Sequence, residues 1–359
     1  MADSKQAPLD AEAAAKAAFA SVQNQPFPND IFTAPELRWA VIGCGVIANQ
    51  MAQSLALAGR KLTGVANRTL TKAQAFAEQY GVEKVYETVE DLYADPDIDA
   101  VYITTPHNTH ITYLRAALAA GKHVLCEKAI TLNSAELDEA RAIADEHNVV
   151  LMDATTVLHM PLYQELRRRM DAGDFGRMNL AQLNFGSYKE YGDLTNRFYN
   201  RNLAGGAMLD IGVYALSVMR LFMASQPVEV VSLGNTCETG VDVAGGIVCR
   251  NAEQQLGVVS LTLHSKQPKR SVISFDNCYV EINEYPRADH ATIVWTADGH
   301  REEVAAGTEA YALCYEMADL EQAVAGDDSK RELLDYASDV MELMTKLRAD
   351  WGVVYPEEE

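Results

Sequence analysis

The chain has 359 residues, of which 48% are hydrophobic and 23% charged, and it carries a net charge of −21 at neutral pH. This composition is typical of a folded globular protein and excludes a disordered one, and the length predicts two domains. The negative charge argues against nucleic acid and anionic membranes as partners, so an anionic ligand needs a local positive site.

We expect residues 1–36 to form an N-terminal arm that is partly helical. Asp10 is a candidate N-cap for an alanine-rich helix that ends near residue 22. The start of the chain has acidic residues and no apolar segment of the kind found in signal peptides. The six cysteines include no CxxC pair. We interpret them as free thiols in a reducing compartment, which predicts a cytoplasmic protein.

From residue 37 onward, short apolar strands alternate with helices. Strands separated by helices pair in parallel through right-handed crossovers, so residues 37–154 are predicted to form an α/β Rossmann domain with a doubly wound parallel sheet. The expected strands are 37–43, 62–67, 99–105, 123–128 and 148–154, and the expected helices are 46–58, 71–80, 88–95, 110–121 and 134–146.

After residue 154 strand-like segments follow one another with few helices between them. This pattern predicts an α+β domain with a mostly antiparallel open sheet over residues 155–330, which serves substrate binding and oligomerisation. A C-terminal helix and tail, residues 331–359, should pack back on the body. An open sheet face that its own helices leave uncovered needs a partner, so we expect a homodimer or homotetramer. The expected strands are 178–186, 228–236, 245–250, 256–264, 271–275, 279–284 and 291–296, and the expected helices are 161–171, 312–325 and 330–349.

The junction between the first strand and the first helix has the pattern G-x-G-x-x-A. Gly43 permits a tight turn, and Gly45 has no side chain to block a pyrophosphate at the helix N-terminus. We assign this loop to a dinucleotide and include Val46 and Ile47 in its site. The alternative is an ordinary glycine turn.

The end of the second strand favours NADP over NAD. An NAD site usually has an acidic residue there, but residues 61–77 contain none. Arg68 can pair with a 2′-phosphate and stack on adenine. Asn67, Thr69 and Lys72 complete this part of the predicted site. Alternatively, Arg68 is a solvated residue and the site accepts NAD.

Two further loops follow strands whose carboxyl ends lie on the same edge of the sheet. In the first, TTPHNTH, we assign Thr105, Pro106, His107, Asn108 and His110 to the cofactor site. No cysteine or carboxylate completes a metal set with the two histidines, so no metal is expected. In the second loop Glu127 and Lys128 form a charged pair at the end of an apolar strand. That pair either faces the cofactor cleft or is a surface ion pair.

Six segments are arranged in the order found in one known family: AVIGCGVIA, TPHNTH, AALAAGKHVLCEKAI, LMDA, AGGAMLDIGVYAL and WGVVYPEE. Over nearly all of residues 37–358 the sequence resembles the Gfo/Idh/MocA family of NAD(P)-dependent oxidoreductases. Within it, the chain is more similar to the branch of dihydrodiol and xylose dehydrogenases, which carries a tyrosine where most members have a histidine. Here that residue is Tyr214.

The resemblance implies hydride transfer between nicotinamide C4 and a carbinol or carbonyl carbon of a sugar, polyol or cyclic diol. Lys128 would contact the reacting oxygen and the cofactor ribose. Tyr214 would transfer the proton, with its usual pKa of about 10 lowered by Lys128, and Asp210 would orient the substrate. Glu127 joins the cofactor site. The predicted substrate-binding residues are Lys128, Thr156, His159, Tyr188, Arg197, Asp210 and Tyr214.

One departure from the family pattern concerns Ala129, which replaces the proline of the E-K-P signature. The substitution either shifts Lys128 or only loosens its loop. Two other functions remain open. The first alternative to the dehydrogenase is an enzyme that keeps NAD bound and recycles it while acting on a sugar or glycoside. The second is a sensor that binds a dinucleotide without catalysis.

Overall fold

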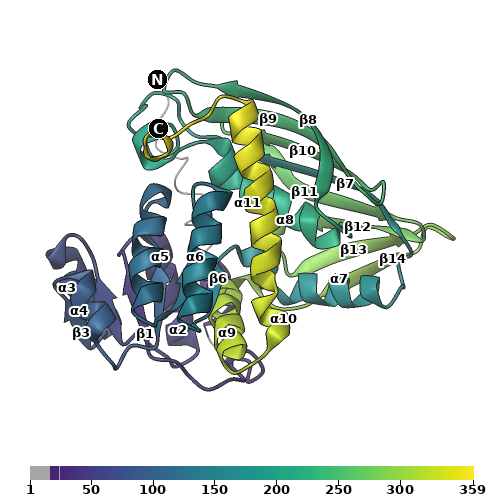
Figure 1. Cartoon of the computed structure of the whole chain (residues 1–359). Coiled ribbons are helices and arrows are strands. Elements are labelled where there is room, and N and C mark those ends of the chain that lie inside the picture. Colours follow the sequence, from purple (N-terminus) through teal and green to yellow (C-terminus); the bar gives the residue numbers. More distant parts are fainter. Residues whose placement is uncertain (1–16, 24) are drawn as a thin grey trace, which may run out of the picture. The chain divides into compact units, whose positions relative to one another are not determined.

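The computed structural model describes residues 17–23 and 25–359. The candidate cap Asp10 lies outside this range, and residues 17–22 are helical. Among the described residues the chain forms two compact units (Figure 1). One contains residues 17–154 and 310–335, and the other contains residues 155–309 and 336–359.

The first unit, called here the dinucleotide unit, is built on a parallel sheet. Its described strands have the order β3-β2-β1-β4-β5-β6, which is the order of a Rossmann fold. Residues of β1, β2, β4 and β6 are buried, as expected for strands covered on both faces. The strands are β1 (Trp39–Ile42), β2 (Gly64–Ala66), β3 (Lys84–Tyr86), β4 (Ala100–Ile103), β5 (His123–Cys126) and β6 (Leu151–Asp153).

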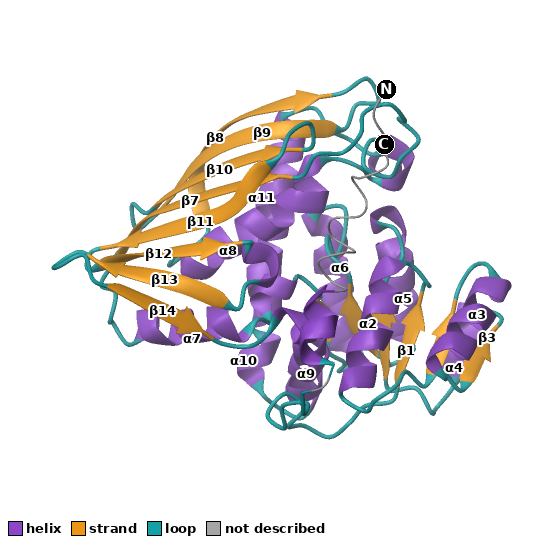
Figure 2. Cartoon of the chain, turned by 180° about the vertical axis from the view of Figure 1, so that it is seen from behind, coloured by secondary structure: helices purple, strands orange, loops and turns teal. Residues whose placement is uncertain are grey.

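Helices cover both faces of this sheet (Figures 1 and 2). Helix α6 begins after Asn133, whose side chain accepts a hydrogen bond from the amide of Glu136 at 3.0 Å. The helices of the unit are α2 (Val46–Leu57), α3 (Leu70–Tyr80), α4 (Val89–Ala94), α5 (His110–Ala119), α6 (Ser134–Glu146), α9 (Ala312–Val324) and α10 (Asp328–Arg331), with the short 3-10 helix η1 (His107–Thr109).

The predicted boundary at residue 330 is wrong for one segment. Residues 310–335 belong to the dinucleotide unit, because α9 buries Leu313, Met317 and Leu320 in the core of the parallel sheet. Glu321 on the same helix accepts hydrogen bonds from the Trp39 indole at 3.0 Å and from Arg60 at 2.6 Å. The sequence predicted the helix but not the sheet it covers, since its apolar face suits either one.

The second unit, called here the sheet unit, contains a mostly antiparallel sheet, as predicted. Its described strands have the order β14-β13-β12-β11-β7-β10-β9-β8, and the pair of β7 and β10 is parallel. The prediction missed β14, an edge strand of mainly charged and exposed residues. The strands are β7 (Met178–Gly186), β8 (Pro227–Thr236), β9 (Asp242–Asn251), β10 (Leu256–Thr262), β11 (Gln267–Phe275), β12 (Cys278–Asn283), β13 (His290–Trp295) and β14 (Arg301–Ala305).

Helices α8 and α11 lie on one side of this sheet (Figures 1 and 2). The ring of Trp351, just after α11, occupies space left by Gly234 and Gly245, which are paired on β8 and β9. The helices of the unit are η2 (Thr156–Leu158), α7 (Pro161–Asp171), η3 (Arg201–Leu203), the π-helix η4 (Met208–Gly212), α8 (Val213–Phe222), η5 (Tyr285–Arg287) and η7 (Pro356–Glu358); η6 (Glu309–Tyr311) and α11 (Leu333–Asp350) join the two units.

One helical stretch of the described chain, residues 201–222, has the length and apolar composition of a membrane span. Of its most apolar window, 83% is buried inside the protein. Since α8 contacts β7 and β10, we interpret this stretch as the core helix of the sheet unit.

Candidate functional site

The glycine loop after β1 is fixed by the ends of two neighbouring strands. Gly43 has φ +102°, and a side chain there would lie 2.7 Å from the hydroxyl of Thr104. The amide of Gly43 donates to the carbonyl of Ala66 at 2.9 Å, and the Thr104 hydroxyl donates to Ile42 at 3.0 Å. The position therefore requires glycine for both its backbone angle and its space.

The N-terminus of α2 fits the pyrophosphate of a dinucleotide. Gly45 caps the helix without any side-chain hydrogen bond, and the first turn has no acidic residue. A Cβ on Gly45 would meet nothing within 4 Å, so the backbone faces open space. Val46 is 70% exposed beside it, and Ile47 is half-buried. Unpaired amides and the positive end of the helix dipole favour an anion here.

Cys44 lies within this loop and is half-buried. Burial raises the pKa of its thiol to about 11, although Lys72 opposes the shift. The thiol therefore stays protonated at neutral pH.

The residues predicted to select NADP lie at the carboxyl end of β2. Asn67 donates from its amide to the Thr69 carbonyl at 3.0 Å, which shapes the turn into α3. Thr69 caps α3 without a side-chain hydrogen bond. The side chains of Arg68, Thr69 and Lys72 are exposed. Two cations are thus accessible where a 2′-phosphate would bind, and the preference for NADP stays a prediction.

The loop after β4 lies beside the glycine loop, because β4 pairs with β1. The Thr109 hydroxyl donates to the Thr105 hydroxyl at 2.8 Å and lies 2.7 Å from the Pro106 carbonyl. The rings of His107 and His110 meet edge to face at 5.9 Å.

His110 is fully buried at the base of this loop. Its ring nitrogens lie 3.0 Å from the Ala129 carbonyl and 2.8 Å from the Thr105 carbonyl. Burial lowers the pKa of His110, which favours the neutral ring. The contacts seen for His110 are therefore with the protein, and its contact with the cofactor, like those of His107 and Asn108, remains a prediction. No group of three potential metal ligands occurs in the described part of the chain.

The two residues of the charged pair after β5, Glu127 and Lys128, differ in their surroundings. The hydroxyl of Tyr102, a fully buried residue of β4, donates to the Glu127 carboxylate. The Glu127 amide donates to Ile103 at 3.0 Å, which extends the pairing of β4 and β5. Glu127 is thus bonded to the sheet, and the half-buried Lys128 follows at the same edge as Gly43. The peptide bond between Lys128 and the buried Ala129 is cis.

Sequence reasoning missed Tyr102. The signal was available: a hydroxyl-bearing residue stands inside an otherwise apolar strand that pairs with the strand ending at the charged pair.

In the sheet unit Asp210 and Tyr214 lie at the start of the core helix. Asp210 belongs to the π-helix η4 and is 8% exposed, and Tyr214 lies in the first turn of α8. The Arg197 guanidinium lies 3.4 Å from the Asp210 carboxylate. The Tyr214 ring packs against Phe185 with 6.1 Å between the ring centres. Single π-helical turns inside longer helices occur frequently at functional sites.

The other predicted substrate residues divide by exposure. Tyr188 and Arg197 are exposed, and the Arg197 guanidinium lies 4.2 Å from the ring centre of Phe198. Thr156 is buried within η2, and His159 is buried directly after it. Whether these four residues contact substrate stays a prediction, and the exposed pair is accessible to a ligand.

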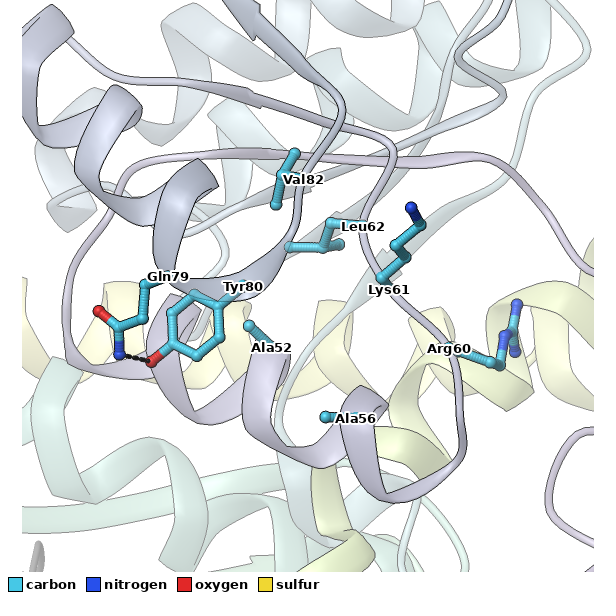
Figure 3. Close-up of a pocket in the computed structure, with 8 residues that line it drawn as sticks. All are labelled: Ala52, Ala56, Arg60, Lys61, Leu62, Gln79, Tyr80 and Val82. Carbon is cyan, nitrogen blue, oxygen red and sulfur yellow. Dashed lines mark hydrogen bonds between the residues drawn. The ribbon is translucent and has the colours of Figure 1, made fainter.

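The dinucleotide unit has a surface hollow that is lined by residues from α2, from the segment before β2 and from the end of α3 (Figure 3). Leu62 precedes β2, so the hollow is at the amino ends of the strands, and open α/β sheets bind ligands at the carboxyl ends. Gln79 donates to the Tyr80 hydroxyl at 2.9 Å there. The lining residues are Ala52, Ala56, Arg60, Lys61, Leu62, Gln79, Tyr80 and Val82.

Comparisons with known proteins agree with this geometry. Residues 37–155 match the family described as "Oxidoreductase family, NAD-binding Rossmann fold", and residues 163–281 match the GFO/IDH/MocA C-terminal domain. The chain is 32% identical over 244 residues to trans-1,2-dihydrobenzene-1,2-diol dehydrogenase of Mus musculus. The aligned segment covers 66% of this chain and 72% of the relative.

Two solved structures share the fold. A 3-ketoreductase from Actinomadura kijaniata in complex with NADP and TDP-benzene has a TM-score of 0.75 at 26% identity, over 88% of this chain and 98% of that one. Levoglucosan dehydrogenase in complex with NADH and levoglucosan has a TM-score of 0.76 at 19% identity, over 87% and 97% of the two chains.

A doubly wound sheet with an open glycine loop at its first strand is the architecture of a dinucleotide-binding domain, and the family match makes it that of an oxidoreductase. The chain belongs to the Gfo/Idh/MocA family of NAD(P)-dependent oxidoreductases, with dihydrodiol dehydrogenases among its relatives. The predicted family, fold class and enzyme class are confirmed, as is the nicotinamide dinucleotide as cofactor.

Proposed function

We propose that the protein is an NADP-preferring dehydrogenase or reductase that acts on a hydroxyl or carbonyl group of a sugar, polyol or cyclic diol. The observation that carries the proposal is the position of Lys128, which follows β5 at the same sheet edge as the glycine loop after β1. A cation there is beside the space for the nicotinamide half of the cofactor. The diol dehydrogenase and the sugar-related enzymes among the relatives support this substrate class.

The protein's own task is to manage the oxygen and its proton. When bound, the dinucleotide accepts or supplies the hydride at nicotinamide C4. In the direction of oxidation Tyr214 acts in its phenolate form: the substrate O–H bond breaks, and the proton passes to the phenolate oxygen and leaves Tyr214 as a neutral phenol. The Lys128 ammonium stabilises the negative charge that develops on the substrate oxygen. Asp210, beside Arg197, accepts a hydrogen bond from a substrate hydroxyl and orients it. The family resemblance supports joint action of these residues.

The direct test is turnover by the full chain with NADP⁺ and NAD⁺. We would offer trans-1,2-dihydrobenzene-1,2-diol, levoglucosan and D-xylose and follow the nicotinamide absorbance. Oxidation of at least one compound, with a higher kcat/KM for NADP⁺ than for NAD⁺, is the expected result. No turnover in either direction with alcohols or with the matching ketones would contradict the proposal.

The preference for NADP depends on Arg68. We expect Arg68→Gln to weaken NADPH binding about 10-fold or more and NADH binding much less, because only NADPH presents a 2′-phosphate. Arg115→Gln, an exposed arginine on α5 of the same unit, is the control and should change neither affinity. Equal losses for both cofactors in Arg68→Gln would assign the arginine to adenine stacking alone.

Two experimental outcomes would favour one of the two alternative functions over the proposed dehydrogenase. NAD that remains bound through purification and does not exchange would favour internal recycling of the cofactor on a sugar or glycoside. Reversible binding of the dinucleotide without turnover would favour a sensor. Native mass spectrometry before and after incubation with NADPH separates these outcomes.

The exposed apolar side chains on one face of the large sheet support a homodimer or homotetramer. Val231 on β8 pairs with Val248 on β9, and both point away from the face that Trp351 covers. Val231 and Leu233 are 75% and 83% exposed, and with Leu256 on β10 they extend the apolar surface. A second copy of the chain is the occupant we propose. Leu233→Lys should give monomers by light scattering, whereas Val354→Lys, at an exposed residue of the C-terminal tail, should not.

A cytoplasmic location is also proposed. All six cysteines are free, and four of them are buried. Free thiols suit a reducing compartment, and the net charge of −21 disfavours nucleic acid and anionic membranes. Cell fractionation with an antibody to the chain would test the location.

A further inference from the structure

A buried polar cluster lies beneath the start of the core helix of the sheet unit. Asp242 at the start of β9 is fully buried, and so is Tyr355 in the C-terminal tail. Arg348, near the end of α11, is 2% exposed. Charged groups are almost never buried to this degree unless they are paired or hydrogen-bonded. The arrangement here centres on the Gly205-Gly206 turn that precedes η4.

Asp242 holds the first residues of the helix. Its carboxylate accepts a hydrogen bond from the Met208 amide at 2.6 Å. The other carboxylate oxygen faces Gly206 so closely that a Cβ there would lie 2.3 Å from it. A carboxylate at this place satisfies an amide that the first turn of a helix leaves unpaired.

The C-terminal tail holds the turn from the other side. The Tyr355 hydroxyl donates to the Gly205 carbonyl at 2.6 Å. Glu358 fixes the tail, because its carboxylate accepts two hydrogen bonds from Arg348, at 2.9 and 2.8 Å, and one from the Tyr355 amide at 3.0 Å. The Arg348 guanidinium also lies 4.7 Å from the centre of the Tyr355 ring.

The Gly205-Gly206 turn is tightly packed against its neighbours. A Cβ on Gly205 would lie 2.7 Å from the carbonyl oxygens of Arg197 and Phe198. The Asp210 amide donates to the Gly206 carbonyl at 3.3 Å, so the helix begins its hydrogen bonding at this turn. A movement of the turn is therefore passed directly to Asp210 and, one helical turn later, to Tyr214.

We propose that Asp242 and Tyr355 are positioning residues, which fix the start of the helix so that Asp210 and Tyr214 are held in the geometry that proton transfer requires. This inference rests on the proposed function for the roles of Asp210 and Tyr214. Displacements of about 1 Å in a catalytic group reduce rates by up to ~100-fold, so even a small loosening of the turn is measurable. In this proposal Tyr355, held in place by Glu358, acts on catalysis through the start of the helix.

The test uses the full-length enzyme and two independent readouts. Tyr355→Phe removes only the hydroxyl bonded to Gly205, and Asp242→Ala removes the acceptor for the Met208 amide. Asp242→Asn keeps an acceptor and should recover most of the loss. Tyr163→Phe is the matched control, because its buried hydroxyl donates to the Tyr285 carbonyl at 2.6 Å in the same unit, away from the turn.

We expect Tyr355→Phe and Asp242→Ala to lower kcat by about 10-fold or more, while KM for NADP⁺ changes less than about 2-fold. Hydrogen exchange of peptides within residues 204–216 should become faster in both variants. Tyr163→Phe should change neither quantity. Turnover is measured with whichever of the trans-dihydrodiol, levoglucosan and D-xylose the wild type oxidises.

Two results would overturn the inference. One is unchanged exchange in residues 204–216 for both variants. The other is faster exchange with an unchanged kcat. If the wild type oxidises none of the probes, the proposed function is at fault, and the exchange data alone then decide whether the tail holds the helix. If Asp242→Ala fails to fold, Tyr355→Phe and Asp242→Asn still decide the question.

Discussion

The two residues proposed to act on the reacting oxygen are supported in different ways. Lys128 is the second residue after strand β5 of the parallel sheet, and its neighbour Glu127 is bonded to Tyr102 and Ile103 of the adjacent strand. Tyr214 lies on a helix whose start is held by Asp242 and by the chain's last residues. Support for the lysine is thus local to the sheet edge, whereas support for the tyrosine comes from distant parts of the sequence. The comparison predicts that the two residues respond to different kinds of mutation.

The largest effect is expected at Lys128 itself. Lys128→Met should lower kcat/KM by about 1,000-fold, because removal of one preorganised charge from an oxyanion costs about 100- to 1,000-fold and the family resemblance also assigns the lysine to the cofactor ribose. Steady-state kinetics with the best probe substrate measure the loss. Lys61→Met, an exposed lysine at the opposite edge of the same sheet, is the control. A loss below about 10-fold would show that Lys128 does not act on the oxygen.

Gly206→Ala should have the next largest effect, on stability. A Cβ there lies 2.3 Å from the Asp242 carboxylate, and the backbone has φ +127°. We expect a loss of about 2–4 kcal/mol in the free energy of unfolding, from steric overlap and backbone strain together. Urea denaturation of the variant measures it. Gly246→Ala, where a Cβ meets nothing within 4 Å, should change stability by less than about 1 kcal/mol.

Asp242 should make stability depend on pH. Burial raises its pKa from the usual 3.8 to about 6, against the opposing effects of the Met208 amide and Arg348. The folded protein thus binds this proton more tightly than the unfolded chain. The contribution of Asp242 to the free energy of unfolding is fully present below the pKa of this carboxyl in the unfolded chain, 3.8. It is lost as pH rises through about 6, the pKa in the folded protein.

Asp242→Asn removes this titration. Between pH 4 and pH 7 the wild type should lose up to about 3 kcal/mol relative to the variant, at about 1.4 kcal/mol for each unit of pKa shift. Urea unfolding of both proteins across this range checks the sign and the size. A parallel pH dependence of the two proteins would mean that Asp242 keeps its ordinary pKa in the fold.

The smallest effect is expected at Tyr102. Tyr102→Phe removes the donor to Glu127, so stability should fall by about 1–3 kcal/mol and kcat by a few-fold as the loop of Lys128 loosens. Tyr86→Phe is a matched control, since the Tyr86 hydroxyl donates to Asp95 at 2.7 Å in the same unit. The control should lose similar stability in thermal melts and keep its kcat. If both variants keep full activity, Tyr102 supports the fold alone.

Much of the dinucleotide unit could be predicted because its information is local. Apolar strands separated by helices predict a parallel sheet, and the carboxyl ends of parallel strands share one edge. The glycine loop, Arg68 and Lys128 were therefore placed correctly at strand ends. The boundary after Ala154 coincides with the end of the first continuous segment of this unit. Helix α9 was placed in the wrong unit, because an apolar helix face does not specify which sheet it will cover.

The sheet unit shows the opposite case. A single aspartate within the segment GVDVAGG and a tyrosine near the chain end carry no local signal that they share one turn. Their meeting requires β9, α11 and the tail to be folded around Gly205 and Gly206. Contacts between residues far apart in sequence follow from packing of whole elements, which the pattern of any one element does not contain.

By itself the sequence determined the family, the Rossmann unit with its glycine loop, and the residue types available for hydride and proton chemistry. These follow from short motifs and from periodicity, which act over a few residues. Only the tertiary structure decided that α9 completes the dinucleotide unit, that Tyr102 bonds Glu127, and that Asp242 and Tyr355 meet at the helix start. Each of these buries a polar or apolar group against a distant partner, and burial of this kind is settled by the whole fold.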